Sequence, residues 1–147
     1  MQITSRFTLA IHTMLCIACF SDTHKVTSNF IAGSTNSNPV VIRRILGQLK
    51  DANLVKVERG VGGATITKPL DEITLLDIFN AVEAVGNNFF NFHDNANCKC
   101  PVGKNIHTIL DGHLYDIKKA MNEQMEKTNL QILLNETKPF LKQYQSQ

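Results

Sequence analysis

The stretch NPVVIRRILGQLKDANLVKVERGVGG, residues 38–63, joins an amphipathic helix pattern with two adjacent arginines to a basic, glycine-rich hairpin pattern. Asn38 is a favourable N-cap, and Pro39 fits the first helical position, where no intrahelical hydrogen bond needs its missing N–H. A helix that begins at about Pro39 has a predicted buried stripe of Ile42, Ile45, Leu46 and Leu49. The same helix presents outward Val40, Val41, Arg43, Arg44, Gly47 and Gln48. The sequence therefore predicts a helix with a basic exposed face, followed by a hairpin.

A shorter helix is expected just before this one, over SNFIA at residues 28–32. Thr27 is a suitable N-cap, and the small side chain of Ala32 allows a second helix to cross closely. Asn36 enters the left-handed backbone region at low cost, as a tight turn between helices requires. Two helices joined in this way predict a helix-turn-helix, whose second helix enters the major groove of DNA.

The exposed face of the second helix suits base and phosphate recognition. Arg43 or Arg44 can bind a phosphate or the acceptor edge of guanine, while Val40 and Val41 can contact thymine methyl groups. An arginine pair can also be no more than a solvated helix face. The hairpin that follows favours the DNA-binding interpretation.

The segments LVKVE (54–58) and ATITK (64–68) alternate apolar and polar residues, as half-buried strands do. Between them RGVGG (59–63) has glycine at 60, 62 and 63, which permits a tight turn and a close approach of the backbone to another surface. In a winged helix such a hairpin lies over the neighbouring minor groove, where an inserted arginine is attracted. Arg59 is the predicted arginine at this tip.

The charge distribution agrees with a nucleic-acid partner. The chain has 147 residues, enough for one domain with a real core, and carries a formal net charge of +2. Residues 1–70 hold eight Lys and Arg against three Asp and Glu, a net charge of +5, so the remainder carries −3. Positive charge concentrated in one half favours an encounter with a polyanion.

The N-terminal apolar run FTLAIHTMLCIACF, residues 7–20, allows two interpretations. It can be the core of an export signal, with Cys19 as a lipoprotein cysteine, or an amphipathic helix of a folded core. Thr8, His12 and Thr13 interrupt the run and only Arg6 precedes it, which favours the core helix; the run is also too short to span a bilayer. We therefore expect a cytoplasmic protein that does not enter the membrane, whose four cysteines are reduced thiols or ligands and not structural disulfides.

A long helix is predicted from about Gly103 to Met125, after a short helix that begins with a capping box at Thr74 and Asp77. It is roughly 35 Å long and carries an apolar stripe. The residues of this stripe are Ile106, Leu110, Leu114, Ile117 and Met121. Either the stripe folds back on its own domain or it pairs with a second copy in a two-fold dimer. The dimer is favoured, because one small domain cannot cover so much apolar surface. Beyond it, TNLQILLNE (128–136) is expected to be helical and TKPFLKQYQSQ (137–147) to fray.

Four segments together resemble the Rrf-two family of bacterial transcriptional regulators, which includes IscR, NsrR and CymR. They are MQITSRFTLAIHTMLCIA (1–18), VTSNFIAGSTNSNPVVIRRILGQLKDANLV (26–55), VERGVGGATIT (57–67) and EITLLDIFNAVEAV (72–85). The resemblance covers about residues 1–125, and the RGxGG wing is its most specific part. It implies a homodimeric winged-helix protein that binds a nearly palindromic operator. Its DNA-contacting positions correspond here to Asn38, Val40, Val41, Arg44 and Arg59. Val41 replaces a tyrosine common in relatives, which implies a different base preference.

The loop GNNFFNFHDNANCKCPVG, residues 86–103, is the candidate sensor. Family members with an iron–sulfur cluster use three spaced cysteines there, whereas this chain has only Cys98 and Cys100, so no cluster is expected. Three interpretations stay open: a zinc or cluster site completed by a histidine, a redox-active thiol favoured by nearby lysines, or a small-molecule pocket or no effector at all. The pocket would be walled by Phe89, Phe90 and Phe92.

The fold expected is mainly α with a small β-hairpin wing: a winged helix-turn-helix over 1–85, a sensor loop over 86–102 and a dimerisation helix with a helical tail over 103–147. The function expected is a dimeric regulator, a repressor, bound to a double-stranded DNA operator, with a thiol or small-molecule effector. The predicted DNA-binding residues are Thr27, Ser28, Asn38, Val40, Val41, Arg43, Arg44, Arg59, Gly60 and Gly62. The alternative is a small metal- or thiol-dependent enzyme built around Cys98 and Cys100, which leaves the wing unexplained.

Overall fold

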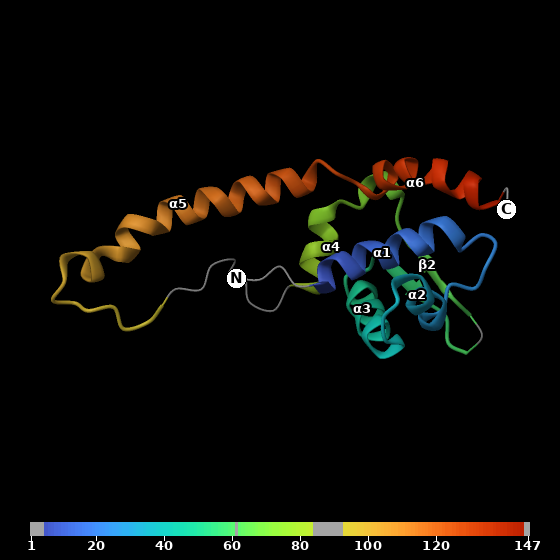
Figure 1. Cartoon of the computed structure of the whole chain (residues 1–147), viewed down its shortest axis with the longest axis horizontal. Coiled ribbons are helices and arrows are strands. Elements are labelled where there is room, and N and C mark those ends of the chain that lie inside the picture. Colours follow the sequence, from blue (N-terminus) through green and yellow to red (C-terminus); the bar gives the residue numbers. More distant parts are fainter. Residues whose placement is uncertain (1–4, 61, 84–92, 146–147) are drawn as a thin grey trace.

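The computed structural model describes residues 5–60, 62–83 and 93–145. In chain order its elements are α1 (Ser5–Phe20), α2 (Ser28–Thr35), α3 (Pro39–Asp51), β1 (Val55–Val57), β2 (Ala64–Ile66), the 3-10 helix η1 (Leu70–Glu72), α4 (Leu75–Val82), α5 (Pro101–Glu126) and α6 (Leu130–Gln145). Helices α1 to α4 and the hairpin form a body, α6 lies over α1, and α5 projects from that body as an arm (Figure 1). The mainly α fold with a hairpin wing is confirmed.

The local signals of the helix-turn-helix are confirmed at each position. The Thr27 hydroxyl accepts a hydrogen bond from the Phe30 N–H at 3.2 Å and so caps α2. Asn36 ends α2 in the left-handed region with φ 51°. The Asn38 side chain accepts from the Val40 N–H at 2.9 Å, and Pro39 opens α3. These caps satisfy backbone groups that helix ends leave without partners.

Two antiparallel strands form the wing. β1 pairs with β2 in the register Val55↔Ile66, Lys56↔Thr65 and Val57↔Ala64. Along each strand the side chains alternate from buried to exposed to half-buried. The paired strands are shorter than the alternating segments predict, since each has three residues.

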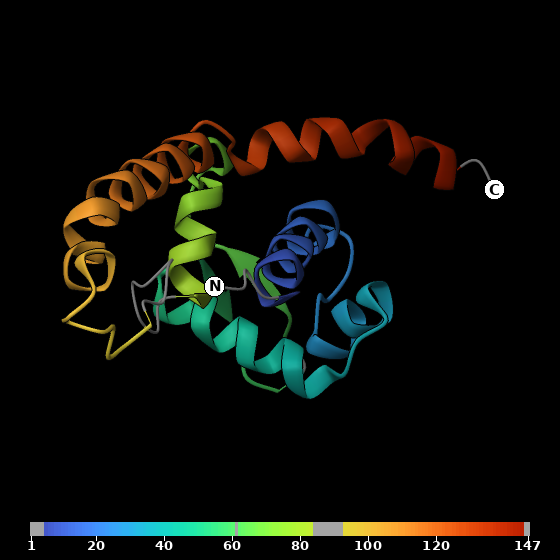
Figure 2. The same cartoon turned by 60° about the vertical axis from the view of Figure 1, so that its left-hand side comes forward.

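The core lies where α1 crosses the helix-turn-helix and α4 (Figure 2). Met14, Ile17, Ile42 and Leu49 have no exposed surface. The ring of Phe7 meets that of Phe79 edge to face at 5.2 Å, which joins α1 to α4. Burying each large apolar side chain stabilises the fold by about 1.5–3 kcal/mol.

Helix α1 is buried around more of its circumference than its apolar stripe predicts. Thr13, which interrupts the apolar run, is fully buried, and so is Cys16 apart from 4% of its surface. The reason is that α1 has neighbours on both sides, α6 as well as α3 and α4. Gln48 on α3 was also expected to face outward, but it is half-buried.

Helices α5 and α6 each differ from the prediction at one end. Helix α5 begins at Pro101 and not at Gly103, with Cys100 as its N-cap. Helix α6 continues through Pro139 to Gln145, so the predicted fraying from residue 137 is wrong. Its first turn is tied to the body, since the Leu130 N–H donates to the Ile73 carbonyl at 2.8 Å and Leu130 is fully buried.

Candidate nucleic-acid interface

A groove with a volume of about 360 Å³ lies between α3, the start of α2 and the wing. The residues lining it are Val26, Thr27, Ser28, Arg43, Leu46, Gly47, Lys50, Val57, Glu58, Gly60, Gly62, Gly63 and Ala64. It brings together five of the residues predicted to bind DNA, namely Thr27, Ser28, Arg43, Gly60 and Gly62. The other five, Asn38, Val40, Val41, Arg44 and Arg59, are exposed outside its lining.

The start of α2 gives this groove an anion-binding character. The first N–H groups of a helix have no intrahelical partner, and the helix dipole places partial positive charge there. Thr27 and Ser28, at this start, both line the groove. A phosphate oxygen is the ligand that such a helix terminus suits.

Two basic side chains of α3 line the same groove. Arg43 and Lys50 are exposed and stand on one helix face, with Gly47 between them. Lys50 was missed by sequence reasoning, although its spacing of seven residues from Arg43 places the two on one face of a helix. Glu58 is the acidic residue of the lining and belongs to the wing.

The first turn of α3 exposes apolar surface. Val40 and Val41 are 50% and 39% exposed, whereas the adjacent Ile42 is fully buried. Two valines at the exposed start of a helix are suited to contact a thymine methyl group in the major groove. Arg44, on the same helix, is also exposed.

The wing is fixed to the connection between α1 and α2. The Ala64 N–H donates a hydrogen bond to the Val26 carbonyl at 2.9 Å. A Cβ atom at Gly63 would lie 2.5 Å from the Val26 nitrogen and 3.0 Å from the Lys25 carbonyl carbon. Glycine is therefore required at position 63 for close approach, while Gly60 serves the turn itself with φ 82°.

We expect Gly63→Ala to detach the wing from this connection. The added methyl group meets backbone atoms that cannot rotate away, so the free energy of unfolding should fall by about 1–3 kcal/mol. Gly47→Ala is the matched control, because no atom lies within 4 Å of its Cβ position. That variant should gain about 0.5–1 kcal/mol from the better helix propensity of alanine. Urea unfolding measures both; equal stability of the two variants would contradict the close packing of the wing.

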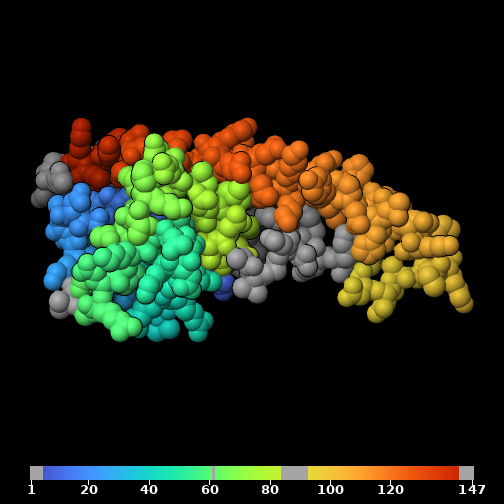
Figure 3. All heavy atoms as spheres, turned by 180° about the vertical axis from the view of Figure 1, so that it is seen from behind, coloured from blue at the N-terminus to red at the C-terminus, as the bar shows by residue number. Residues whose placement is uncertain are grey.

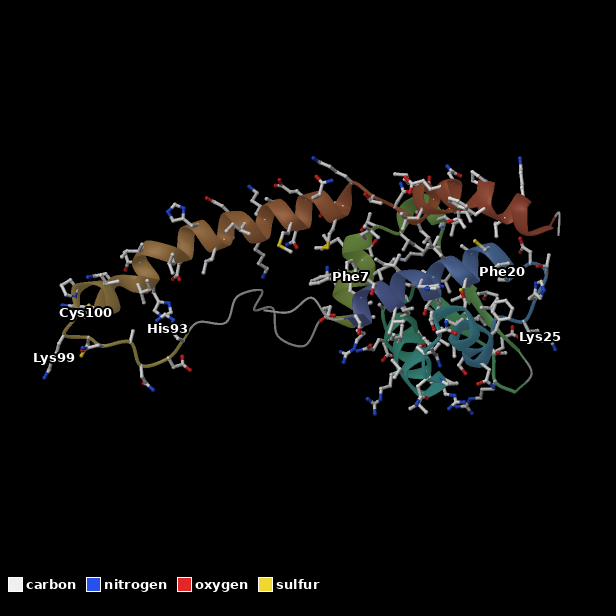
Figure 4. All side chains as sticks on the ribbon, viewed as in Figure 1. Phe7, Phe20, Lys25, His93, Lys99 and Cys100 are labelled. Carbon is white, nitrogen blue, oxygen red and sulfur yellow. The ribbon has the colours of Figure 1, made fainter. Side chains whose placement is uncertain are left out.

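The loop cysteines lie far from the groove. Figure 4 places Lys99, Cys100 and His93 at the outer end of α5, remote from Phe20 and Lys25 on the body. Cys98 and Cys100 are both exposed. The predicted pocket residues Phe89, Phe90 and Phe92 lie outside the described residues. The DNA-binding and sensor candidates are thus two separate sites.

The four thiols differ in their electrostatic surroundings. The backbone N–H groups of Gly103 and Val102, in the first turn of α5, lower the pKa of the Cys100 thiol. Burial raises the pKa of Cys16, against a smaller lowering by a hydrogen bond with Ser34. Burial also raises the pKa of Cys19. Cys100 therefore has the strongest thiolate character of these three.

Comparison with known proteins settles the family. The Rrf2 family model, described as an iron-dependent transcriptional regulator, matches residues 3–136. The chain belongs to the Rrf2 family. A Bacillus subtilis (strain 168) protein with the provisional name of HTH-type transcriptional regulator YwnA is 38% identical over 134 residues, which are 91% of this chain and 98% of YwnA.

Solved structures share the fold of this Rrf2 protein. A protein provisionally described as DNA-binding is 33% identical, with a TM-score of 0.68 over 88% of this chain and 99% of its own. CymR, the global cysteine regulator of B. subtilis, is 22% identical and shares the fold with a TM-score of 0.66, over 92% of this chain and 97% of its own. This Rrf2 protein is a transcriptional regulator with a DNA-binding fold and is not an enzyme.

The family description names an iron dependence, which would require a set of metal ligands. In the described ranges no group of three or more His, Cys, Asp or Glu side chains is placed to hold a metal ion. The segment 84–92 contains none of these residue types. An iron–sulfur cluster is held by several thiolates, whereas the loop offers two.

No helix among the described residues is long and apolar enough to cross a bilayer.

Proposed function

We propose that this protein is a homodimeric, cytoplasmic repressor that binds a palindromic operator. The observation that carries the proposal is the groove in which α3, the start of α2 and the glycine-rich wing converge. Its basic side chains and helix terminus suit a phosphate backbone, and the exposed start of α3 suits base edges. Occupation of a promoter is the simplest action for a regulator of this size, which supports repression.

The apolar face of α5 supports the homodimer. This 26-residue helix is about 39 Å long and has no buried residue along Pro101–Glu126. Val102, Ile109 and Ile117 are 61%, 51% and 47% exposed. At helical spacing these three share one broad face with Ile106, Leu110, Leu114 and Met121. Ile106, Leu110, Leu114 and Met121 are only half-buried on an arm that projects from the body (Figure 3), which supports the pairing of this face with a second copy.

The arrangement of two copies predicts the operator. A two-fold dimer that reads the major groove places its recognition helices about 34 Å apart, or one turn of DNA. Selection from a random DNA library should therefore return inverted repeats, and footprinting should protect two successive major grooves on one face. Recovery of unrelated sequences with equal affinity would contradict an operator-specific regulator.

We expect Arg59→Ala to weaken operator binding and to flatten its salt dependence. Arg59 is exposed at the wing, where a minor groove with its flanking phosphates is the proposed partner. The slope of log affinity against log salt should fall by about one phosphate equivalent. Fluorescence anisotropy at several salt concentrations measures this slope. Unchanged affinity and slope would remove the wing from the interface.

We further propose that the regulator holds no iron–sulfur cluster and responds instead through the thiols of its loop. Cys98 and Cys100 are exposed at the start of the proposed dimerisation helix. A chemical change there acts on the element that sets the distance between the two recognition helices. A small-molecule effector is the other candidate signal.

A further inference from the structure

We propose that Cys98 and Cys100 form a dithiol that reacts with low-molecular-weight disulfides, with Cys100 as the attacking thiol and Cys98 as the resolving thiol. The product is an intramolecular disulfide. A regulatory role for this disulfide rests on the proposed function, because the disulfide would change α5, the helix through which two copies are proposed to pair. The thiol chemistry itself is independent of DNA.

The two cysteines occupy one tight turn that is clamped to α5. The Cys100 N–H donates to the Asn97 carbonyl at 3.2 Å, and the Lys99 N–H donates to the Asn97 side chain at 2.9 Å. A Cβ atom at Gly103 would lie 2.4 Å from the Asn97 carbonyl oxygen, so glycine lets the turn pack directly on the first turn of α5. The chain therefore holds both thiols in one small region of the surface.

The spacing of the pair is compatible with a disulfide. Consecutive Cα atoms lie about 3.8 Å apart, so residues 98 and 100 cannot be separated by more than about 7.6 Å. The turn brings them closer than a straight chain would, toward the Cα separation of about 4.4–6.8 Å that a disulfide requires. Both side chains are exposed, so an incoming disulfide reaches either sulfur.

The surroundings of Cys100 assign it the attacking role. Cys100 is the N-cap of α5, so its sulfur belongs to the helix terminus, where the N–H groups of Val102 and Gly103 and the helix dipole favour a negative charge. The exposed Lys99 and Lys104 add positive charge next to it. Cys98 has neither the helix terminus nor these N–H groups, which leaves it the role of resolving thiol.

The two remaining cysteines are less accessible than the cysteines of the turn. Cys16 is buried in the core and Cys19 is half-buried on α1. An incoming disulfide cannot reach Cys16 without unfolding of α1, and both thiols are held in the protonated form by burial. Reaction should therefore be confined to the turn.

The reaction has two balanced steps. The Cys100 thiolate attacks one sulfur of the small disulfide, forming a mixed disulfide and releasing one small thiolate. The thiol of Cys98 then loses its proton and attacks the Cys100 sulfur of the mixed disulfide, which releases the second small thiol. Relative to its dithiol form the protein loses two protons and two electrons, and the small disulfide takes them up to become two thiols.

Oxidation alters the first turn of α5. In the disulfide the Cys100 sulfur carries no negative charge, so it no longer stabilises the positive end of the α5 dipole. Val102 and Ile106 belong to the apolar face proposed for pairing. Fraying of this turn removes part of that face, which links the disulfide to the dimer.

The test treats the reduced full-length protein with oxidised glutathione, followed by alkylation, intact mass measurement and peptide mapping. The wild type should lose two hydrogens, with Cys98 linked to Cys100 and no glutathione retained. Cys98→Ser should retain one glutathione on Cys100, and Cys100→Ser should react about tenfold more slowly. A Cys16→Ser/Cys19→Ser double variant should react as the wild type does. Modification of Cys16 or Cys19 at the rate of the turn, or a Cys98→Ser variant without an adduct, would overturn the proposal.

Measuring operator affinity before and after oxidation separates the thiol reaction from its effect on DNA binding. A lower affinity of the oxidised wild type, restored by a reducing agent and absent in Cys98→Ser/Cys100→Ser, supports the regulatory role. An unchanged affinity despite a complete disulfide overturns that role. A protein that binds no DNA in either state contradicts the proposed function, while the mass measurements still decide the thiol reaction.

Discussion

Leu110→Glu should convert the protein from a dimer to a monomer. Leu110 lies in the middle of the apolar face of α5, four residues from both Ile106 and Leu114. A two-fold interface would bury the new carboxylate twice, close to its own copy, without a basic partner. Burial of an unpaired charge costs several kcal/mol, and each copy contributes one. Size-exclusion chromatography with light scattering measures the mass directly.

Operator affinity should fall with the loss of the dimer, by about a hundredfold or more, because the second half-site no longer binds as part of one molecule. The matched control is Tyr115→Glu. Tyr115 is 67% exposed, and its position turns it to the opposite side of α5. That variant should remain dimeric and bind the operator. A dimeric Leu110→Glu variant with normal affinity would place the interface elsewhere on the chain.

Local chemistry made the helix-turn-helix predictable. Thr27, Asn36, Asn38 and Pro39 each act on backbone groups within four residues, and their conformations are as the sequence predicts. The capping box at the start of α4 is another local signal of this kind. In it Thr74 and Asp77 exchange two hydrogen bonds, of 3.0 and 3.1 Å. Signals that act over so few residues depend little on the rest of the fold.

Features that depend on tertiary neighbours were not predictable. The burial of Thr13 follows from helices that pack on both sides of α1, and periodicity alone does not reveal the second side. Helix α6 extends through Pro139 although proline is a helix breaker. The close approach of Gly63 to Val26 joins segments far apart in the chain, where the glycine-rich sequence indicates a turn but not its contact.

The candidate site was predictable in its parts and less so as a whole. The two exposed valines and arginines of α3 follow from the helical stripe, because their neighbours are buried. Lys50 joins the groove only through the position of the wing, which periodicity does not give. In the loop, α5 begins at Pro101, two residues before the predicted start. Cys100 is therefore the N-cap of this helix, and the pKa of its thiol is lowered.

Replacing both arginines of α3, as Arg43→Gln/Arg44→Gln, should nearly abolish operator binding. Arg43 lines the groove and Arg44 is exposed outside its lining. We expect these two arginines to make both phosphate and base contacts. A bidentate contact to guanine is worth about 1–3 kcal/mol. Together with a lost phosphate contact, this should reduce affinity by two orders of magnitude or more. The slope of log affinity against log salt should fall by about 0.9 for each phosphate contact removed.

Lys138→Gln/Lys142→Gln removes the same charge from α6, away from the groove, and is the matched control. If operator affinity depended on net charge alone, both double variants would bind more weakly by the same factor. If the α3 arginines make specific contacts, only the α3 variant should lose affinity. Binding to a scrambled duplex separates the roles within the α3 pair: a lost phosphate contact lowers affinity for both duplexes, and a lost base contact lowers it for the operator alone. If the α3 variant binds the operator with normal affinity and salt slope, this helix does not enter the major groove, and the groove beside it needs another ligand.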